Sequence, residues 1–251
     1  MKRKRIAQSA MLMLFVCVVS IVFSWYISQQ MLDAPMAPSR IQTGTLQPGD
    51  RHYTIAIPYD YSRNQAVPLI LALHYGEHGS PYYGRSYLIG LVEPALRDLE
   101  AIIVAPDCTG DDWTQSDSEQ DVFDVLDHIE ATYKIDSSRT LITGYSMGGT
   151  GTWHLAARHQ DRFAAALPMA ATPPSSAVDT AWDIPIYVIH SSEDELFPLG
   201  STETAVEQLA SEGVSVELAV VDGISHSEWR NFIEPLQEAL PWIQEIWEQS
   251  P

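Results

Sequence analysis

The stretch Leu141–Gly149 reads LITGYSMGG and contains the pattern G-x-S-x-G. An apolar run, Thr140–Thr143, leads into the pattern, and helical spacing over Met147–Arg158 follows at once. A strand, a sharp turn and a helix in this order are the setting of a nucleophile elbow, which presents a serine hydroxyl to a neighbouring base. The glycines suit such a turn because they lack the Cβ atoms that would clash in it. The stretch therefore predicts Ser146 as a nucleophile.

Apolar runs on either side of this stretch alternate with segments of helical spacing. A short continuous apolar run is typical of a parallel strand that is buried on both faces. The expected buried strands are Pro68–His74, Ala101–Ala105 and Ile184–His190. Arg51–Pro58 alternates like a strand, and Phe163–Met169 and Val214–Val221 are further expected strands. The expected helices are Gly84–Leu99, Gln120–Tyr133, Met147–Arg158, Thr202–Ser211 and Glu228–Glu248. The alternation predicts an α/β fold, with a mostly parallel sheet flanked by helices and connections too short for a large lid.

The N-terminus has the composition of a membrane-targeting segment. Four basic residues, Lys2–Arg5, precede Ala10–Ile27, an apolar run of 18 residues. Such a run is long enough to span a bilayer as a helix, and the basic cluster is expected to stay in the cytoplasm. We expect a signal anchor or signal peptide at residues 1–29, a tether at 30–49 and one α/β domain at 50–251. An uncleaved anchor would hold the domain outside the cytoplasm, and cleavage would release it as a secreted or periplasmic protein.

The charge of the chain argues against one class of partner. The net charge is −19, and apart from the four N-terminal basic residues the chain carries 10 Lys and Arg against 33 Asp and Glu. Such a surface repels phosphate backbones and anionic headgroups, so we expect no nucleic acid partner and membrane contact only through the N-terminal helix. Cys108 is the only cysteine beyond that helix, so the domain is expected to contain no disulfide.

A serine on an elbow needs a base and an acid, which follow it in the order acid and then histidine. His226 lies in DGISHSEW, between the last expected strand and the last expected helix, where the base is expected. His190 ends an expected strand and precedes every candidate acid, so we interpret it as a packed histidine. The following loop, SSEDELFP, offers Glu193, Asp194 and Glu195 as the acid, and position alone does not choose among them.

An oxyanion hole requires two backbone N–H groups near the serine. The first is expected from Met147, the residue after the nucleophile. The second is expected from the loop LHYGEHGSP, which follows the strand Pro68–His74. Tyr75 and Gly76 are the candidates in that loop.

No metal or cofactor is expected. Glu77 and His78 resemble a pair of metal ligands, but no third ligand follows at the spacing of a zinc site. A serine hydrolase of this kind needs neither, since the serine and its base supply the chemistry.

Three residues near the expected strand ends are candidates for a substrate cleft. Asp107 and Trp113 lie in APDCTGDDW, which follows the strand Ala101–Ala105, and Tyr145 directly precedes the nucleophile. The Trp113 ring would serve as a platform for substrate, or it would pack beneath its own loop.

From Arg51 to Trp242 the motifs resemble those of a known family. The longest match is YKIDSSRTLITGYSMGGTGTWHLAARHQDRFAAALPMAA; HSSEDELFP is similar to H-G-x-x-D-x-x-V-P, and DGISHSEW to G-x-x-H-x-x-W. The chain thus resembles α/β-hydrolases of the esterase/phospholipase–carboxylesterase group, in the branch of predicted peptidases and polyhydroxybutyrate-depolymerase-like esterases. The resemblance implies Asp194 as the acid and supports His226 as the base. Two departures are Ser191 in place of glycine and LHYGEHG in place of LHGxGExG, which leaves Tyr75 and Gly76 both open.

The resemblance implies a serine hydrolase that cleaves small or polymeric carboxylic esters through an acyl-enzyme. A serine peptidase of the prolyl-oligopeptidase type, or another acyl hydrolase, would use the same three residues. A non-catalytic binding module would be expected to have lost Ser146, Asp194 or His226, and all three positions are filled. The acyl and alcohol groups of the substrate are not specified by these motifs.

Overall fold

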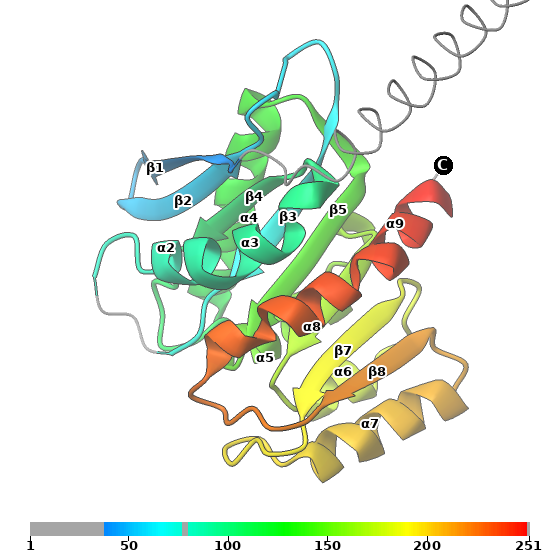
Figure 1. The fold of residues 1–251 in the computed structure, drawn as a ribbon. Helices are drawn as coiled ribbons and strands as arrows, with labels where there is room; N and C mark the ends of the chain where they lie inside the picture. The colour runs from blue at the N-terminus through cyan, green and yellow to red at the C-terminus, as the bar shows by residue number, and fades with distance from the viewer. Residues whose placement is uncertain (1–37, 77–79, 250–251) are drawn as a thin grey trace, which may run out of the picture. The chain divides into compact units, whose positions relative to one another are not determined.

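The computed structural model describes residues 38–76 and 80–249 (Figure 1). The chain divides into two compact units, Met1–Ala37 and Pro38–Pro251, and every described residue belongs to the second. The expected signal or anchor segment, residues 1–29, lies outside the described residues. Within the described part of the chain, no helix has both the length and the apolar character needed to cross a bilayer.

An eight-stranded, mostly parallel sheet forms the centre of the second unit. Its strands lie in the order β1-β2-β4-β3-β5-β6-β7-β8; β1–β2 and β2–β4 pair antiparallel and all other neighbours pair parallel. The strands are β1 Arg40–Leu46, β2 Arg51–Ile57, β3 Val67–Leu73, β4 Ile102–Pro106, β5 Ile135–Tyr145, β6 Ala165–Met169, β7 Ile186–Ser191 and β8 Val216–Val221. The expectation of a mostly parallel sheet is therefore confirmed.

Helices cover both faces of this sheet. The α-helices are α2 Gly84–Tyr87, α3 Glu93–Leu96, α4 Ser116–Thr132, α5 Met147–Arg158, α6 Ser175–Val178, α7 Leu199–Ser211, α8 Ile233–Glu238 and α9 Leu240–Gln249. A π-helical turn, η1 Leu88–Val92, joins α2 to α3, and 3₁₀ turns are η2 Arg97–Leu99, η3 Gln160–Arg162 and η4 Trp229–Phe232. In Figure 1, α3, α8 and α9 lie in front of the sheet, and α4 and α5 lie behind it.

Strand β3 shows why its sequence is wholly apolar. Ile70 and Ala72 pack in one core cluster with residues of α3, α8 and α9, whereas Leu69 and Leu71 pack in another with residues of α4 and α5. Successive side chains of a strand point to opposite faces, so a strand between two helical layers has no solvent-facing position. The run Pro68–His74 is therefore apolar because helices cover the sheet on both sides of β3.

Strand β1 corrects the expected domain boundary. Residues 30–49 are predicted above as a tether, but Arg40–Leu46 pairs antiparallel with β2 over its whole length, from Arg40 opposite Ile57 to Leu46 opposite Arg51. Its sequence, RIQTGTL, is largely polar because an edge strand with one exposed face needs few apolar side chains. The second compact unit accordingly begins at Pro38 rather than at residue 50.

The helix expected over Glu228–Glu248 is also divided. It consists of η4, α8 and α9, with a break at Ala239. Pro241 cannot donate the backbone hydrogen bond required in a helix interior, but it is tolerated within a first turn. A new helix therefore begins at Leu240, immediately before this proline.

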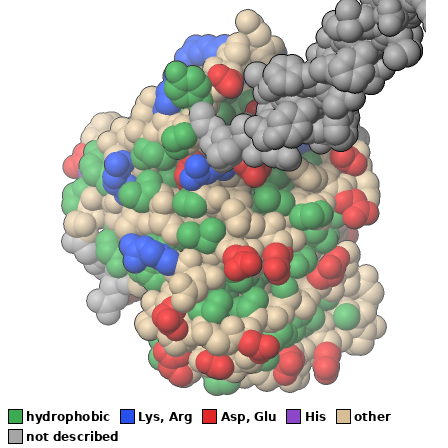
Figure 2. Space-filling model, in the orientation of Figure 1, with side chains coloured by type: hydrophobic (Ala, Val, Ile, Leu, Met, Phe, Trp, Pro, Cys, Tyr) green, Lys and Arg blue, Asp and Glu red, His purple; other side chains and the backbone are tan. Residues whose placement is uncertain are grey.

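Basic residues are missing from the part of the chain that forms the C-terminal half of the sheet. No Lys or Arg occurs between Phe163 and Trp229, a segment that includes β6, β7, α7 and β8. Figure 2 shows red acidic side chains without blue basic ones over this part of the visible face, and both red and blue side chains over the other part. The segment thus contributes 11 Asp and Glu that no basic residue within it offsets.

Candidate active site

Ser146 occupies a strained turn between β5 and α5. Its φ and ψ angles are 57° and −120°, a backbone conformation that non-glycine residues rarely adopt. A Cβ atom at Gly148 would collide with the carbonyl oxygen of Leu73, and one at Gly144 would collide with the carbonyl oxygen of Gly148. The two glycines of the motif are therefore required by close backbone approach, as expected for an elbow.

Three side chains from separate segments form a continuous hydrogen-bonded row. The Oγ atom of Ser146 lies 2.8 Å from Nε2 of His226, and Nδ1 of His226 lies 2.8 Å from Oδ2 of Asp194. A carboxylate only accepts, so Nδ1 of a neutral imidazole carries the proton and Nε2 is free to accept from the serine hydroxyl. The structure thus brings together the three residues that the sequence analysis selected.

Asp194 is held by the loop between β7 and α7, residues 192–198, which we call the acid loop. One oxygen of Asp194, Oδ1, accepts the N–H groups of Leu196 at 3.0 Å and Phe197 at 2.8 Å, which leaves Oδ2 for the imidazole. Of the three acids that the sequence left open, Asp194 is the one that contacts the His226 ring. Glu193 is exposed, and the Glu195 carboxylate instead accepts the backbone N–H of His226 at 3.0 Å.

His190 is buried at the end of β7, as interpreted from the sequence. Its Nε2–H donates to the carbonyl oxygen of Phe197 at 2.7 Å, and burial lowers the pKa of its imidazole. Its Nε2 lies 3.7 Å from Oδ2 of Asp194, beyond hydrogen-bond distance. His190 therefore stabilises the acid loop through its hydrogen bond to Phe197.

The groups expected around the oxyanion lie at the start of α5 and in the loop that follows β3. Met147 is the first residue of α5, and the first N–H groups of a helix have no intrahelical acceptor. The Tyr75 carbonyl accepts Nδ1–H of His74 at 2.9 Å, while Nε2 of that ring accepts the N–H of Cys108 at 3.1 Å. Gly76 has φ of 69°, which glycine adopts without strain. An oxyanion role for Met147, with Tyr75 or Gly76, stays a prediction.

Two residues assigned to the substrate cleft are buried instead. Trp113 is 1% exposed, donates its Nε1–H to the carbonyl oxygen of His74 at 3.0 Å and packs against Gly151 of α5. Tyr145 is also 1% exposed, and its hydroxyl donates to the carbonyl oxygen of His226 at 2.9 Å. For Trp113 the structure supports the packed alternative, and for Tyr145 the cleft assignment is wrong. Each ring is buried, and its polar atom donates to a backbone carbonyl.

Truncation of Trp113 is expected to destabilise the domain. Trp113→Ala should lower the free energy of unfolding by about 3–5 kcal/mol, because it leaves a cavity and an unpaired buried carbonyl. Tyr59→Ala is the matched control, since this aromatic residue is 64% exposed, and it should change stability by less than about 0.5 kcal/mol. Urea unfolding of the full chain measures both. Equal losses in the two variants would contradict the buried position of Trp113.

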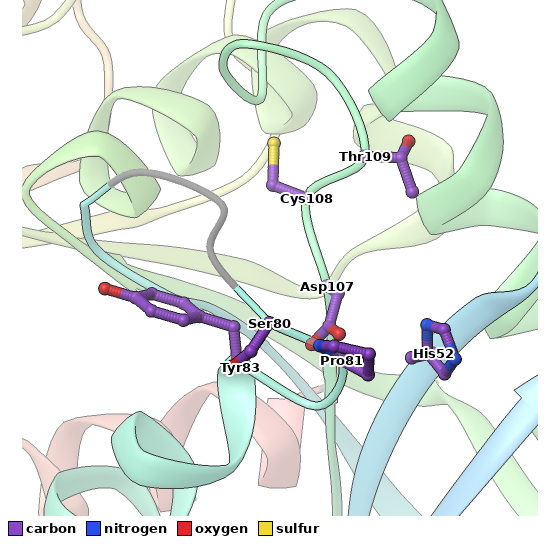
Figure 3. Close-up of a pocket in the computed structure, with 7 residues that line it drawn as sticks. All are labelled: His52, Ser80, Pro81, Tyr83, Asp107, Cys108 and Thr109. Carbon is purple, nitrogen blue, oxygen red and sulfur yellow. The ribbon is translucent and has the colours of Figure 1, made fainter.

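Asp107, the third cleft candidate, lies in a different pocket. Its two carboxylate oxygens accept the N–H groups of Tyr82 and Gly84, so it caps the start of α2. The pocket around it has a volume of about 240 Å³ and is lined by His52, Ser80, Pro81, Tyr83, Asp107, Cys108 and Thr109. In Figure 3 the Asp107 side chain lies beside Pro81, and the Cys108 sulfur points away from it. Cys108 is buried, which raises the pKa of its thiol.

The pocket that contains Ser146 has a volume of about 450 Å³. It is lined by Asp112, Thr114, Ser146, Met147, Thr150, Pro174 and Phe197. Five of these, all except Ser146 and Met147, were not selected from the sequence. Two signals were available: Asp112 and Thr114 flank Trp113, and Phe197 closes the acid loop. The lining therefore combines three apolar residues, Met147, Pro174 and Phe197, with polar ones.

Residues 77–79 lie outside the described part of the chain, so the structure gives no position for Glu77 and His78. Among the residues that are described, no group of three or more His, Cys, Asp or Glu side chains is arranged to hold a metal ion. The absence of a metal and of a cofactor stays an expectation.

Comparison with known proteins identifies relatives of this chain. The chain is 26% identical over 186 residues to "Probable feruloyl esterase C" of Aspergillus niger, covering 69% of this chain and 66% of that protein. It is 28% identical over 134 residues to "Bifunctional acetylxylan esterase/xylanase XynS20E" of Neocallimastix patriciarum, covering 51% of this chain and 19% of that protein. The chain thus spans less than two thirds of the length of these curated relatives.

Solved structures show the same architecture. A thermostable esterase is 25% identical, superposes with a TM-score of 0.69, and the match covers 83% of this chain and 63% of that one. A ferulic acid esterase, 22% identical, also superposes with a TM-score of 0.69 over 84% of this chain and 100% of that one. The family model described as Phospholipase/Carboxylesterase matches residues 106–243, which is more than half of the chain. With its elbow, its mostly parallel sheet and this match, the chain belongs to the phospholipase/carboxylesterase family of α/β-hydrolases.

Proposed function

We propose that this protein is a serine hydrolase that cleaves carboxylic esters, with Ser146, His226 and Asp194 as its catalytic triad. The observation that carries the proposal is the row of hydrogen bonds from Ser146 Oγ through His226 to Asp194, both at 2.8 Å, on a strained elbow. Relatives of the chain are named as esterases, which supports the same chemistry.

The geometry supports the following reaction. His226 Nε2 takes the hydroxyl proton as Ser146 Oγ attacks the ester carbonyl, and Asp194 stabilises the imidazolium. The N–H of Met147 and one N–H from Tyr75 or Gly76 would hold the oxyanion. Collapse of the tetrahedral intermediate releases the alcohol, which takes its proton from His226. Water then repeats the sequence on the acyl-enzyme and releases the carboxylic acid.

The pocket suggests the class of ester. Its volume of about 450 Å³ lies in the range of small-molecule sites. Met147, Pro174 and Phe197 offer apolar contacts for an aromatic or short acyl group, and the polar lining residues Asp112, Thr114 and Thr150 offer partners for hydroxyl groups. Because relatives are named feruloyl and acetylxylan esterases, we place aryl-acyl and acetyl esters of carbohydrates first among the substrates.

Substrate comparison tests this proposal. The purified full chain is expected to hydrolyse p-nitrophenyl acetate and methyl ferulate, and each ester should slow labelling by a fluorophosphonate probe. Long-chain acyl esters should compete poorly, because the pocket is too small to enclose them. Cleavage of peptides with no hydrolysis of any ester would replace the esterase proposal by a peptidase.

We also propose that residues 1–29 anchor the domain to the membrane with its active site outside the cytoplasm. The motivation is the apolar run of 18 residues after Lys2–Arg5. Fractionation of cells that make the full chain, with sequencing of its N-terminus, provides the test. Membrane-bound protein with an intact N-terminus supports the anchor, and soluble protein that begins near Asp33–Pro38 would show a cleaved signal peptide.

A further inference from the structure

His226 lies in the loop between β8 and η4, residues 222–228, which we call the His226 loop. We propose that Tyr145, Ser191 and Glu195 are positioning residues, which hold the backbone of this loop so that the imidazole stays aligned between Ser146 and Asp194. The inference rests on the proposed function of the triad. None of the three side chains is expected to touch substrate.

Tyr145 ties the loop to the elbow. Its hydroxyl donates to the carbonyl oxygen of His226 at 2.9 Å, and its ring packs against Phe232 and against the imidazole, with centroids 5.0 and 5.4 Å away. Burial, reinforced by the charges of Asp194 and Glu195, raises the pKa of Tyr145, so its hydroxyl remains a donor. Because Tyr145 directly precedes Ser146, this bond sets the base relative to the nucleophile.

Glu195 ties the same residue to the acid loop. Its Oε2 atom accepts the backbone N–H of His226 at 3.0 Å, while the neighbouring Asp194 accepts from the ring at 2.8 Å. Both peptide groups of His226 are therefore bound to side chains, its N–H to Glu195 and its C=O to Tyr145. Hydrogen bonds to an ionised acceptor are stronger than those between neutral groups.

Ser191 provides a third tie, which holds the loop at Ile224, two residues before His226. Its hydroxyl donates to the carbonyl oxygen of Ile224 at 2.6 Å, and the side chain is 1% exposed. The same oxygen accepts the N–H of Glu193 at 3.2 Å, so one hydroxyl joins the acid loop to the His226 loop. Ser191 stands where the motif H-G-x-x-D has glycine, and glycine could not form this bond.

All three ties restrict the position of the His226 imidazole between Ser146 and Asp194. His226 must keep one nitrogen on Ser146 and the other on Asp194, and these residues lie at the ends of β5 and β7. Tyr145 fixes the loop to the β5 end, and Ser191 and Glu195 fix it to the β7 end. A displacement of about 1 Å in a catalytic group is enough to cost about 100-fold in rate.

Removal of the ties tests the proposal by kinetics. In the full chain, Tyr145→Phe, Ser191→Gly and Glu195→Ala should each lower kcat for p-nitrophenyl acetate by about 10- to 100-fold while KM changes less than about two-fold. Glu195→Gln keeps an acceptor oxygen and should restore most of the lost kcat. Tyr187→Phe is the matched control, because this tyrosine packs against Trp242 rather than the His226 loop, and it should keep the parental kcat.

Hydrogen–deuterium exchange of residues 222–228 is the second readout, and it does not depend on activity. Exchange should be faster in Tyr145→Phe, Ser191→Gly and Glu195→Ala than in the parent and the Tyr187→Phe control. Unchanged exchange, or faster exchange with an unchanged kcat, would overturn the positioning role. Faster exchange in a protein whose parent hydrolyses no ester would support the ties and contradict the proposed function instead.

Discussion

Replacing Ser146 with alanine is expected to lower the turnover of p-nitrophenyl acetate by a factor of about 10⁶, the loss seen when a serine hydrolase loses its nucleophile. The reason is geometric, since the Ser146 Oγ atom is the only group of the row that can attack an ester carbonyl while His226 Nε2, 2.8 Å away, takes its proton. Steady-state hydrolysis, with thermal unfolding to show that the variant folds, measures the effect.

Ser211→Ala provides the matched control for this prediction. Ser211 is an exposed serine at the end of α7, and its hydroxyl donates to the carbonyl oxygen of Gln208. Its removal should leave turnover unchanged. Turnover in Ser146→Ala within about tenfold of the parent would exclude Ser146 as the nucleophile, because the oxyanion hole alone leaves far less activity than that.

The second large effect is expected at the acid. Asp194→Asn should keep the fold but lower turnover by about 10⁴, because the amide favours the wrong imidazole tautomer and cannot stabilise the imidazolium. The side chain is 1% exposed and its Oδ2 atom lies 2.8 Å from His226 Nδ1. Solvent therefore cannot compensate for the loss of its charge. The measurement is kcat for a p-nitrophenyl ester in correctly folded protein.

The neighbouring acids are the controls for Asp194. Glu193 is exposed, and Glu195 accepts only a backbone N–H, a bond that glutamine can also accept. Glu193→Gln and Glu195→Gln should therefore change turnover little. A loss in Glu193→Gln as large as that in Asp194→Asn would show that the acid has been assigned to the wrong residue.

Features carried by strong local signals could be predicted from the sequence. Strands β3, β4 and β7 are apolar runs because helices cover both faces of the sheet. The elbow needs glycines because backbone atoms approach each other closely there. Chain order and motif resemblance then pointed to His226 and Asp194, which the structure places in one row with Ser146.

Features that depend on side-chain direction could not be predicted. A tryptophan in a loop has the same sequence signal whether it faces solvent or the core, and only the fold shows that Trp113 lies between His74 and Gly151. Strand β1 carries a polar edge sequence that is indistinguishable from a tether. The Ser146 pocket gathers Thr114, Pro174 and Phe197 from three distant segments, which no local pattern connects.

If Ser146 is the nucleophile, an acyl-enzyme on its hydroxyl can be trapped during turnover. The full chain would be mixed with p-nitrophenyl acetate, quenched in acid within the first turnovers, digested and mapped by mass spectrometry. We expect one acetyl group on the peptide that contains Ser146, and its loss in Ser146→Ala. Acetylation at another residue, or rapid hydrolysis with no acetylated peptide, would contradict it.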